Sequence, residues 1–255
     1  MPCLIAVFVG LQAWPVLREK GILPFFLDAR WAPPSDQYNL VPMIAGTLVS
    51  SALALALSAP AAVAYGLHVN LFAGPTFATT ARTCMGLLAG IPSVVFGLVA
   101  LTKLVPLFVD AHPPGLGLGV TVVTLAVMVL PTAATAIDAA VQQVPPDGIR
   151  AVRALGLGAW DAARGVVLPL AAPGIRTGLL LTLGRAAGET MAVLMVSGNT
   201  VAWPTAPFAP FRTLTGNVAV EMAYASGLHR SALFFSAAIL FGFVAGIILL
   251  EQRRG

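Results

Sequence analysis

The chain has 255 residues, of which 58% are hydrophobic and 9% are charged, and its mean hydropathy is +0.90. Soluble domains carry about 25% charged residues, so this composition excludes a soluble globular protein and indicates an integral membrane protein. The formal net charge of +4 suits basic side chains placed against anionic headgroups of a lipid bilayer, and it does not indicate a nucleic-acid partner.

The apolar runs predict an all-α integral membrane protein with about six transmembrane helices in one domain, residues 1–255. Residues 1–17 make a shortened first span. A span needs about 20 mainly apolar residues, and uncharged runs of that length follow at 37–67, 83–102, 113–137 and 231–250. Between the last two of these, 175–198 makes a further span if its two charged residues turn away from lipid.

Basic residues outside the spans indicate how the chain crosses the membrane. With six spans both termini share a side, and Lys and Arg count seven on that side against six opposite. The denser cluster between Arg150 and Arg176, together with Arg253 and Arg254, favours termini in the cytoplasm. We therefore expect a multi-pass protein of the cell inner membrane.

The Cys and His residues do not indicate a metal site. Cys3 and Cys84 fall near the predicted cytoplasmic face, where thiols stay reduced. His68, His112 and His229 are scattered among predicted loops, away from other metal-ligating residues. We expect no metal and no other cofactor to be bound by this chain.

Pro92 interrupts the predicted span at 83–102. It removes a helix hydrogen bond and predicts a kink, which serves either as a gate or as a static bend. The hydroxyls of Ser93 and Thr47 are candidates for lining a substrate pathway. The alternative is that each hydroxyl bonds its own helix or a neighbouring one.

Residues 138–174 form the longest predicted cytoplasmic connection. Pro145 and Pro146 break the preceding helix, an amphipathic stretch around Trp160 follows, and Pro169 ends it. We predict a short helix lying across the cytoplasmic face. Its apolar stripe either rests on the other helices or fills a cleft in a partner protein.

Arg185 and Glu189 are the most informative residues, because both lie in an otherwise apolar run. A charge in hydrocarbon costs about 3 kcal/mol or more, so such residues face a protein interior or a watery path. The pair, with Thr190 beside it, therefore marks a candidate site. The alternative is a buried ion pair that only fixes helix packing.

Residues 200–230 form the longest predicted external loop. Aromatic and charged residues alternate there, which favours a protein-docking surface over a re-entrant segment at the interface. These residues are Trp203, Phe208, Phe211, Arg212, Glu221 and Tyr224.

Four segments carry a resemblance to a known family. RAV at 150–152, Gly156 and VVLP at 166–169 are spaced like the coupling-loop motif of ABC importer permeases, with Arg150 in place of the usual glutamate. The runs GRAAGETMAVLMVSGN, LLAGIPSVVFGL and LVPMIAGTL, which begin at 184, 87 and 40, resemble the PstC-type permease of the phosphate ABC importer. The resemblance covers most of the chain from Trp31 onward.

The resemblance implies a type I ABC importer permease fold and an assembly of several subunits. A PstA-like permease would complete the translocation path, cytoplasmic ATPase subunits would bind ATP and Mg, and a periplasmic phosphate-binding protein would deliver phosphate. No Gly-x-x-x-x-Gly-Lys-Ser/Thr motif occurs in the chain, so ATP hydrolysis is expected from a partner. ATPase coupling is assigned to Arg150, Ala151, Leu155, Gly156, Trp160, Leu168 and Pro169.

Given the resemblance, Arg185 has a chemical role. Its guanidinium is always charged and presents a planar fork of donors that matches phosphate oxygens. Glu189, one helical turn further, is placed to pair with Arg185 while the path is empty. We therefore predict a transport subunit, not an enzyme, with no catalytic residue. Two alternatives are a permease for another oxyanion, such as sulfate or molybdate, and an intramembrane enzyme that uses Glu189 as an acid or base.

Overall fold

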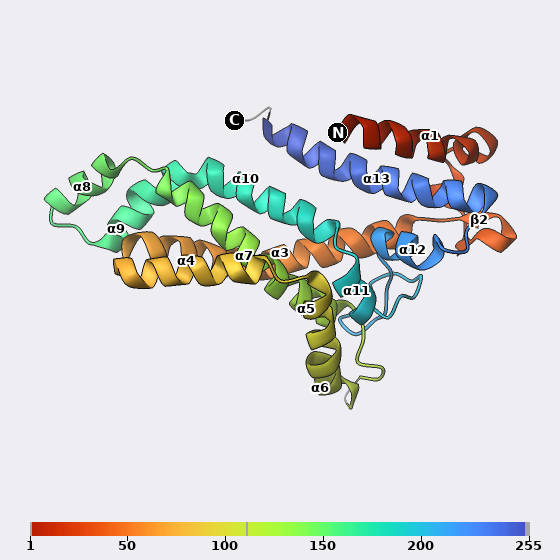
Figure 1. The fold of residues 1–255 in the computed structure, drawn as a ribbon, viewed down its shortest axis with the longest axis horizontal. Helices are drawn as coiled ribbons and strands as arrows, with labels where there is room; N and C mark the ends of the chain where they lie inside the picture. The colour runs from red at the N-terminus through yellow and green to blue at the C-terminus, as the bar shows by residue number, and fades with distance from the viewer. Residues whose placement is uncertain (1, 111, 253–255) are drawn as a thin grey trace.

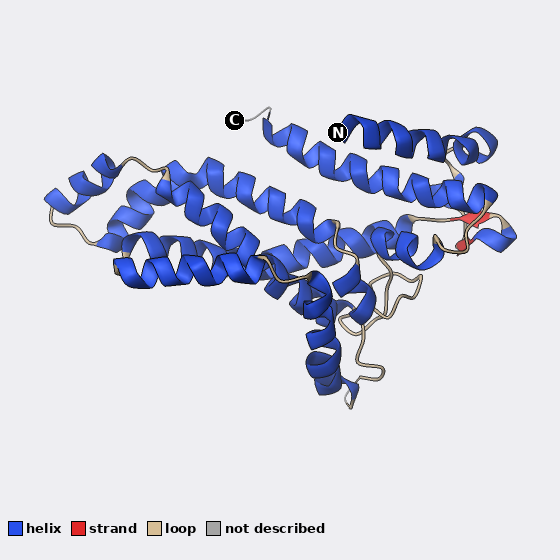
Figure 2. Cartoon of the chain, in the orientation of Figure 1, coloured by secondary structure: helices blue, strands red, loops and turns tan. Residues whose placement is uncertain are grey.

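The computed structural model describes residues 2–110 and 112–252, which are mostly helical (Figures 1 and 2). The α-helices are α1 (Pro2–Lys20), α2 (Pro24–Leu27), α3 (Val41–Leu71), α4 (Pro75–Ala89), α5 (Ser93–Val99), α6 (Val105–Val109), α7 (Leu118–Gln142), α8 (Pro146–Ala154), α9 (Ala159–Ala162), α10 (Leu168–Ala187), α11 (Met191–Val196), α12 (Leu214–Glu221) and α13 (Gly227–Gln252). The 3₁₀ turn η1 (Pro33–Ser35) lies between strands β1 (Trp31–Ala32) and β2 (Gln37–Tyr38), and η2 (Ala100–Leu104) and η3 (Ala163–Val167) are π-helical.

Four helices of the described chain are long and apolar enough to cross a membrane: Val41–Leu71, Leu118–Gln142, Ala159–Ala187 and Gly227–Leu249. A fifth crossing is made if the bent pair Pro75–Ala89 and Ser93–Val109 counts as one span. The prediction of an all-α membrane protein is therefore confirmed. Helix α1 packs along α13 but is not among these spans, so a sixth span stays a prediction.

Helices α3, α7 and α10 form the centre of the bundle (Figure 1). Glycines at their contacts bring the backbones together, since a Cβ on Gly66 would lie 2.8 Å from Ile137 and one on Gly178 would lie 2.9 Å from Ala136. Close approach through small residues is how membrane helices gain packing energy without a hydrophobic driving force. The Gly residues of α10 thus fix it against α7.

A second packing centre lies where α1 meets α13. The two short strands pair antiparallel there, with Trp31 opposite Tyr38. Phe25, Tyr38 and Leu233 are buried in one apolar cluster that joins this hairpin to α13. The residues before α3 are therefore a packed cap on the bundle.

The predicted kink at Pro92 is confirmed, and it breaks the predicted span at 83–102 into two helices. Helix α4 ends at Ala89, α5 begins at Ser93, and the two axes differ by 88°. Proline lacks an N–H and disfavours helical geometry in the preceding residue, so the helix breaks. Helices α5 and α6 consequently project away from the bundle (Figure 1).

Two predicted helix boundaries around α10 are also wrong. The helix does not stop at Pro169, because α9, η3 and α10 run continuously from Ala159 to Ala187. Membrane helices tolerate proline where a local π turn rearranges the backbone hydrogen bonds, and η3 directly precedes Pro169. The predicted span at 175–198 is divided, since α10 ends at Ala187 and α11 is a separate short helix.

Candidate functional site

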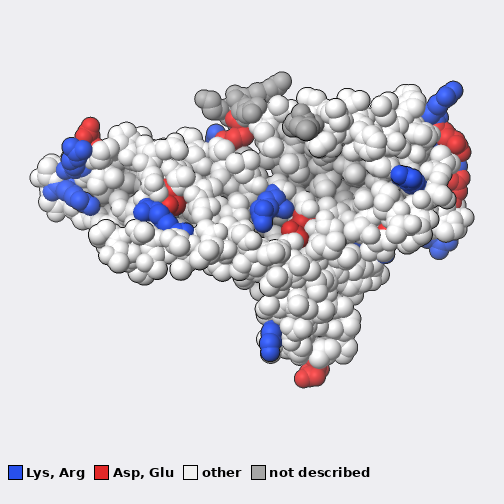
Figure 3. Space-filling view, viewed as in Figure 1, with Lys and Arg blue, Asp and Glu red and all other residues white. Residues whose placement is uncertain are grey.

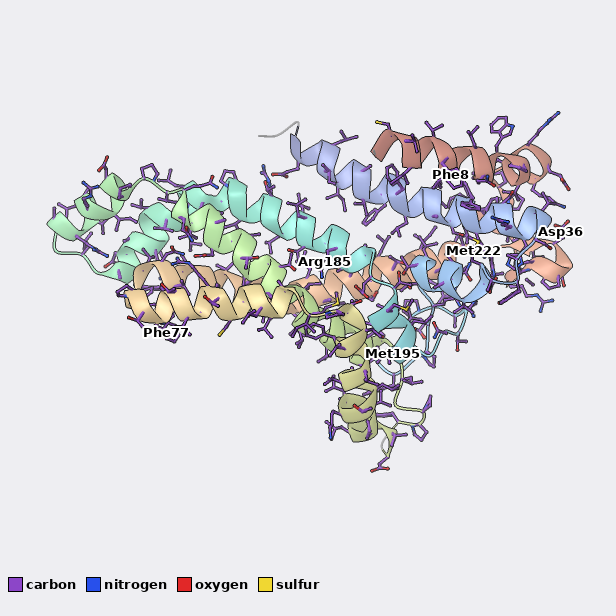
Figure 4. The ribbon with its side chains drawn as sticks, viewed as in Figure 1. Phe8, Asp36, Phe77, Arg185, Met195 and Met222 are labelled. Carbon is purple, nitrogen blue, oxygen red and sulfur yellow. The ribbon has the colours of Figure 1, made fainter. Side chains whose placement is uncertain are left out.

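Arg185 lies in the last turn of α10, where the negative end of the helix dipole favours a cation. Its side chain is exposed, and it makes no hydrogen bond or ion pair with any residue in 2–110 or 112–252. Figure 3 shows few charged side chains over the middle of this face, and Figure 4 places Arg185 there. All of its guanidinium donors are thus free to bind an anion.

Glu189 does not form the predicted ion pair with Arg185 within the described chain. The pairing assumed a continuous helix, but α10 ends before Glu189. The carboxylate of Glu189 instead accepts a hydrogen bond from the backbone N–H of Ala192 at 3.2 Å. Its carbonyl accepts one from the Thr215 hydroxyl at 2.8 Å. Glu189 therefore helps to hold the connection between α10, α11 and α12.

The three predicted pathway hydroxyls lie in different surroundings. Thr190 is half-buried and lines a cavity of about 220 Å³ together with Thr215 and Ser236. Thr47 is buried, donates to the carbonyl of Met43 and accepts from the backbone N–H of Leu214. Ser93 is half-buried at the start of α5. The structure brings Thr190 next to Glu189, and it occupies Thr47 with structural bonds. Their roles in transport stay predictions.

A buried charged cluster that the sequence did not predict lies beside this site. The Glu221 carboxylate accepts from Arg212 at 2.6 Å, from the Trp31 indole at 2.9 Å and pairs with His229 at 2.9 Å. Arg212 also donates to Asn217 and to the carbonyl of Asn199. The cluster joins the 200–213 loop, α12, α13 and the hairpin.

This cluster corrects the interpretation of residues 200–230 as a docking surface. Glu221 is buried and Arg212 is mostly buried, with side chains 10% and 13% exposed, and Phe211 is fully buried. These three residues are unavailable to a docking protein, whereas Trp203 and Tyr224 are exposed. The position of these charged residues close to two apolar spans was a signal that they are buried. Their partners could not be identified, because the partners are distant in sequence.

A second charged cluster lies at the opposite end of the bundle. Arg82 of α4 contacts both oxygens of Asp138 of α7, at 2.8 and 3.0 Å. Asn70 and Gln142 each donate to the same carboxylate. Asp138 is 7% exposed and thus stays charged only through these partners. The cluster fastens α4 to α3 and α7.

The predicted coupling residues lie around α8 and α9 at one tip of the molecule (Figure 1). Leu155 is 77% exposed and Trp160 is 51% exposed, with Arg164 stacked on the Trp160 ring at 4.6 Å. Gly156 has a φ of +74° just after α8, a conformation that favours glycine. Arg150 is exposed, and its one ion pair within the described residues is with Asp147 of its own helix, at 3.4 Å.

The remaining coupling residues fall on either side of this tip. Ala151 is exposed on α8, Pro169 is exposed on α10, and Leu168 is half-buried. The exposed apolar side chains at the tip suit a protein partner better than water. Their role in coupling, and the limits 138–174 of the coupling loop, stay predictions.

The chain matches a family of membrane transport components. The family described as "Binding-protein-dependent transport system inner membrane component" matches residues 61–251. The phosphate transport system permease protein PstC of Pasteurella multocida is 32% identical over 273 residues, covering 98% of this chain and 85% of that protein. The PstC protein of Haemophilus influenzae is 28% identical, with the same coverage.

A solved structure shows the same fold. An inward-facing MetNI methionine ABC transporter chain is 20% identical and aligns with a TM-score of 0.65, over 84% of this chain and 93% of that one. The chain therefore has the type I ABC importer permease fold.

The chain belongs to the binding-protein-dependent transport system inner membrane component family. It is a multi-pass subunit of the inner membrane and a transport component, so the alternative of an intramembrane enzyme is not supported. As the permease of an ABC importer, it is expected to work with a second permease, an ATPase and a binding protein.

Proposed function

We propose that this chain is the permease subunit of an ATP-driven phosphate importer, in which it forms the translocation path with a PstA-like permease. The observation that carries the proposal is Arg185, an exposed arginine without a partner among the described residues, at the broken connection after α10. The relatives of this chain that are named as phosphate transport permeases support phosphate as the transported anion.

Arg185 provides a transient binding site for phosphate within the membrane. Its planar fork makes two parallel charge-assisted hydrogen bonds to an oxyanion, which lysine cannot reproduce. Glu189 is held by Ala192, so it repels phosphate without neutralising Arg185. A site with one arginine and a carboxylate close in the chain binds an anion and still releases it, as transport requires.

Energy for transport comes from outside this chain. The exposed Leu155 and Trp160 suit a cleft on a cytoplasmic ATPase, which binds ATP and Mg. A periplasmic phosphate-binding protein delivers phosphate to the opposite side. Movement of the tip on ATP binding is passed to Arg185 along the continuous helix from Ala159 to Ala187.

The test is ATP-driven uptake of labelled phosphate into liposomes that hold the complete complex. We expect uptake that requires ATP and is reduced by unlabelled phosphate but not by sulfate or molybdate at the same concentration. Liposomes with the second permease and ATPase but without this chain are the control. Uptake of sulfate or molybdate in place of phosphate would assign the same architecture to another oxyanion.

A further inference from the structure

Arg176 of α10 is a second arginine whose donors are incompletely used. Its Nε donates to both oxygens of Glu251, each at 3.2 Å. Its two terminal nitrogens make no hydrogen bond to the residues that the structure describes. The side chain is 46% exposed, although it stands on an apolar helix. Four N–H groups of Arg176 therefore have no acceptor among the described residues.

Two apolar grooves meet at Arg176. One lies between α10 and α13, has a volume of about 470 Å³ and includes Leu181 and Ile248. The other lies between α3 and α10, has a volume of about 470 Å³ and includes Val63 and Ile175. Arg176 and Leu180 line both grooves, so the guanidinium stands where the two grooves join.

The depth of Arg176 suits a lipid headgroup. It precedes Arg185 by nine residues on one helix, which is roughly 14 Å along the axis at 1.5 Å per residue. The hydrocarbon core is about 30 Å thick, so with Arg185 near its middle Arg176 is at its boundary. The boundary is on the side of α8 and α9, which we predict to be cytoplasmic.

We infer that Arg176 and the two grooves bind one glycerophospholipid of the cytoplasmic leaflet. The lipid phosphate accepts hydrogen bonds from the terminal nitrogens of Arg176, and one acyl chain lies in each groove. Basic pockets between membrane helices on the cytoplasmic side bind lipid headgroups in this way. Only 22% of the apolar window of α10 and 17% of that of α13 are buried inside the chain, so the site is open for lipid.

Charge and shape both favour this occupant. A phosphate oxygen is the acceptor that an arginine fork fits best, and apolar walls on either side of one cation suit a molecule with two acyl chains. A helix of a second subunit would fill a single groove, and it would satisfy Arg176 only by placing an acceptor opposite the guanidinium. The inference needs only the membrane placement of the chain, so it does not depend on phosphate as the transported anion.

The test is native mass spectrometry of the delipidated complex titrated with dioleoyl-phosphatidylglycerol. We expect one tightly bound lipid, with affinity roughly ten- to a hundredfold lower in Arg176→Gln, since charged hydrogen bonds contribute about 1.5–3 kcal/mol. Arg176→Lys should lie between the two. Dioleoylglycerol, which lacks the phosphate, and a lysophospholipid with one acyl chain should both bind weakly.

Two further variants keep the test informative. Arg230→Gln is the matched control, because Arg230 stands at the opposite end of α13 over the Phe234 ring. Leu180→Trp should fill both grooves and lower lipid binding while Arg176 is retained. Equal binding of phosphatidylglycerol by the native complex and Arg176→Gln would overturn the inference. So would equal binding of dioleoylglycerol by the native complex.

Discussion

Arg185, at the end of α10, and Arg212, just before α12, differ in exposure and in the number of their hydrogen-bond partners. The Arg212 side chain is 13% exposed and contacts Glu221, Asn217 and a backbone carbonyl. Arg185 is exposed and has no partner in the part of the chain that the structure describes. A buried charge persists only when its hydrogen-bonding groups are satisfied, so Arg212 is structural. The free donors of Arg185 fit its proposed role in binding an anion.

The buried Asp138 carboxylate resembles Arg212 in having several hydrogen-bond partners. Its carboxylate accepts from Arg82, Asn70 and Gln142, and it joins three helices. The Arg82 side chain is 37% exposed and so reaches solvent or headgroups. The charges of these two clusters thus have several partners among the described residues, whereas Arg185 has none there.

The largest effect on stability is expected at Glu221. Glu221→Leu leaves Arg212 buried without its carboxylate, which should lower the free energy of unfolding by about 3–5 kcal/mol. The double variant Arg212→Met with Glu221→Leu should lose less than Glu221→Leu alone, because no unpaired charge is left. Thermal unfolding of the detergent-purified complex measures both. An unchanged thermal unfolding midpoint in Glu221→Leu would show that the cluster does not stabilise the fold.

A smaller loss is expected at Asp138. Asp138→Asn keeps the size of the side chain and removes its charge, so Arg82 loses charge-assisted hydrogen bonds worth about 1.5–3 kcal/mol. The loss should fall at the low end, since Arg82 is partly exposed. Asp110→Asn, at an exposed site, is the matched control in the same unfolding measurement. A larger loss than in Glu221→Leu would reverse the order that burial predicts.

The smallest effect is expected at Arg150. It is exposed and bonded only to Asp147 in its own helix, so the shape of the tip does not depend on it. Arg150→Glu should leave stimulation of the partner ATPase unchanged or raise it, whereas Trp160→Ala should lower it. ATP hydrolysis by the reconstituted complex is the measurement. A clear loss in Arg150→Glu would show that this chain uses a different docking contact.

The sequence predicted the elements that depend on local pattern. The apolar runs located α3, α7 and α13 to within a few residues, and Pro92 located the break between α4 and α5. The Arg185–Glu189 pair was predicted from helical spacing alone, and it is not formed because α10 ends between the two residues. The spacing of the two charges does not reveal where the helix that carries Arg185 ends.

The charged clusters were beyond sequence reasoning for a different reason. Trp31 and Glu221 are 190 residues apart, and only the folded hairpin brings the indole to the carboxylate. Arg212 and Glu221 therefore looked like residues of an exposed loop. The same absence of long-range information hid the two grooves beside Arg176, which need α3, α10 and α13 together.

The most direct measurement compares Arg185→Ala and Arg185→Lys with the native complex in both phosphate uptake and thermal unfolding. We predict that the free energy of unfolding changes by no more than about 0.5 kcal/mol, as for a surface residue without partners. Uptake should fall by about tenfold or more in Arg185→Ala, since at least one charge-assisted contact is lost, with only partial recovery in Arg185→Lys. Native uptake in Arg185→Ala, or a loss of stability like that of Glu221→Leu, would contradict the account.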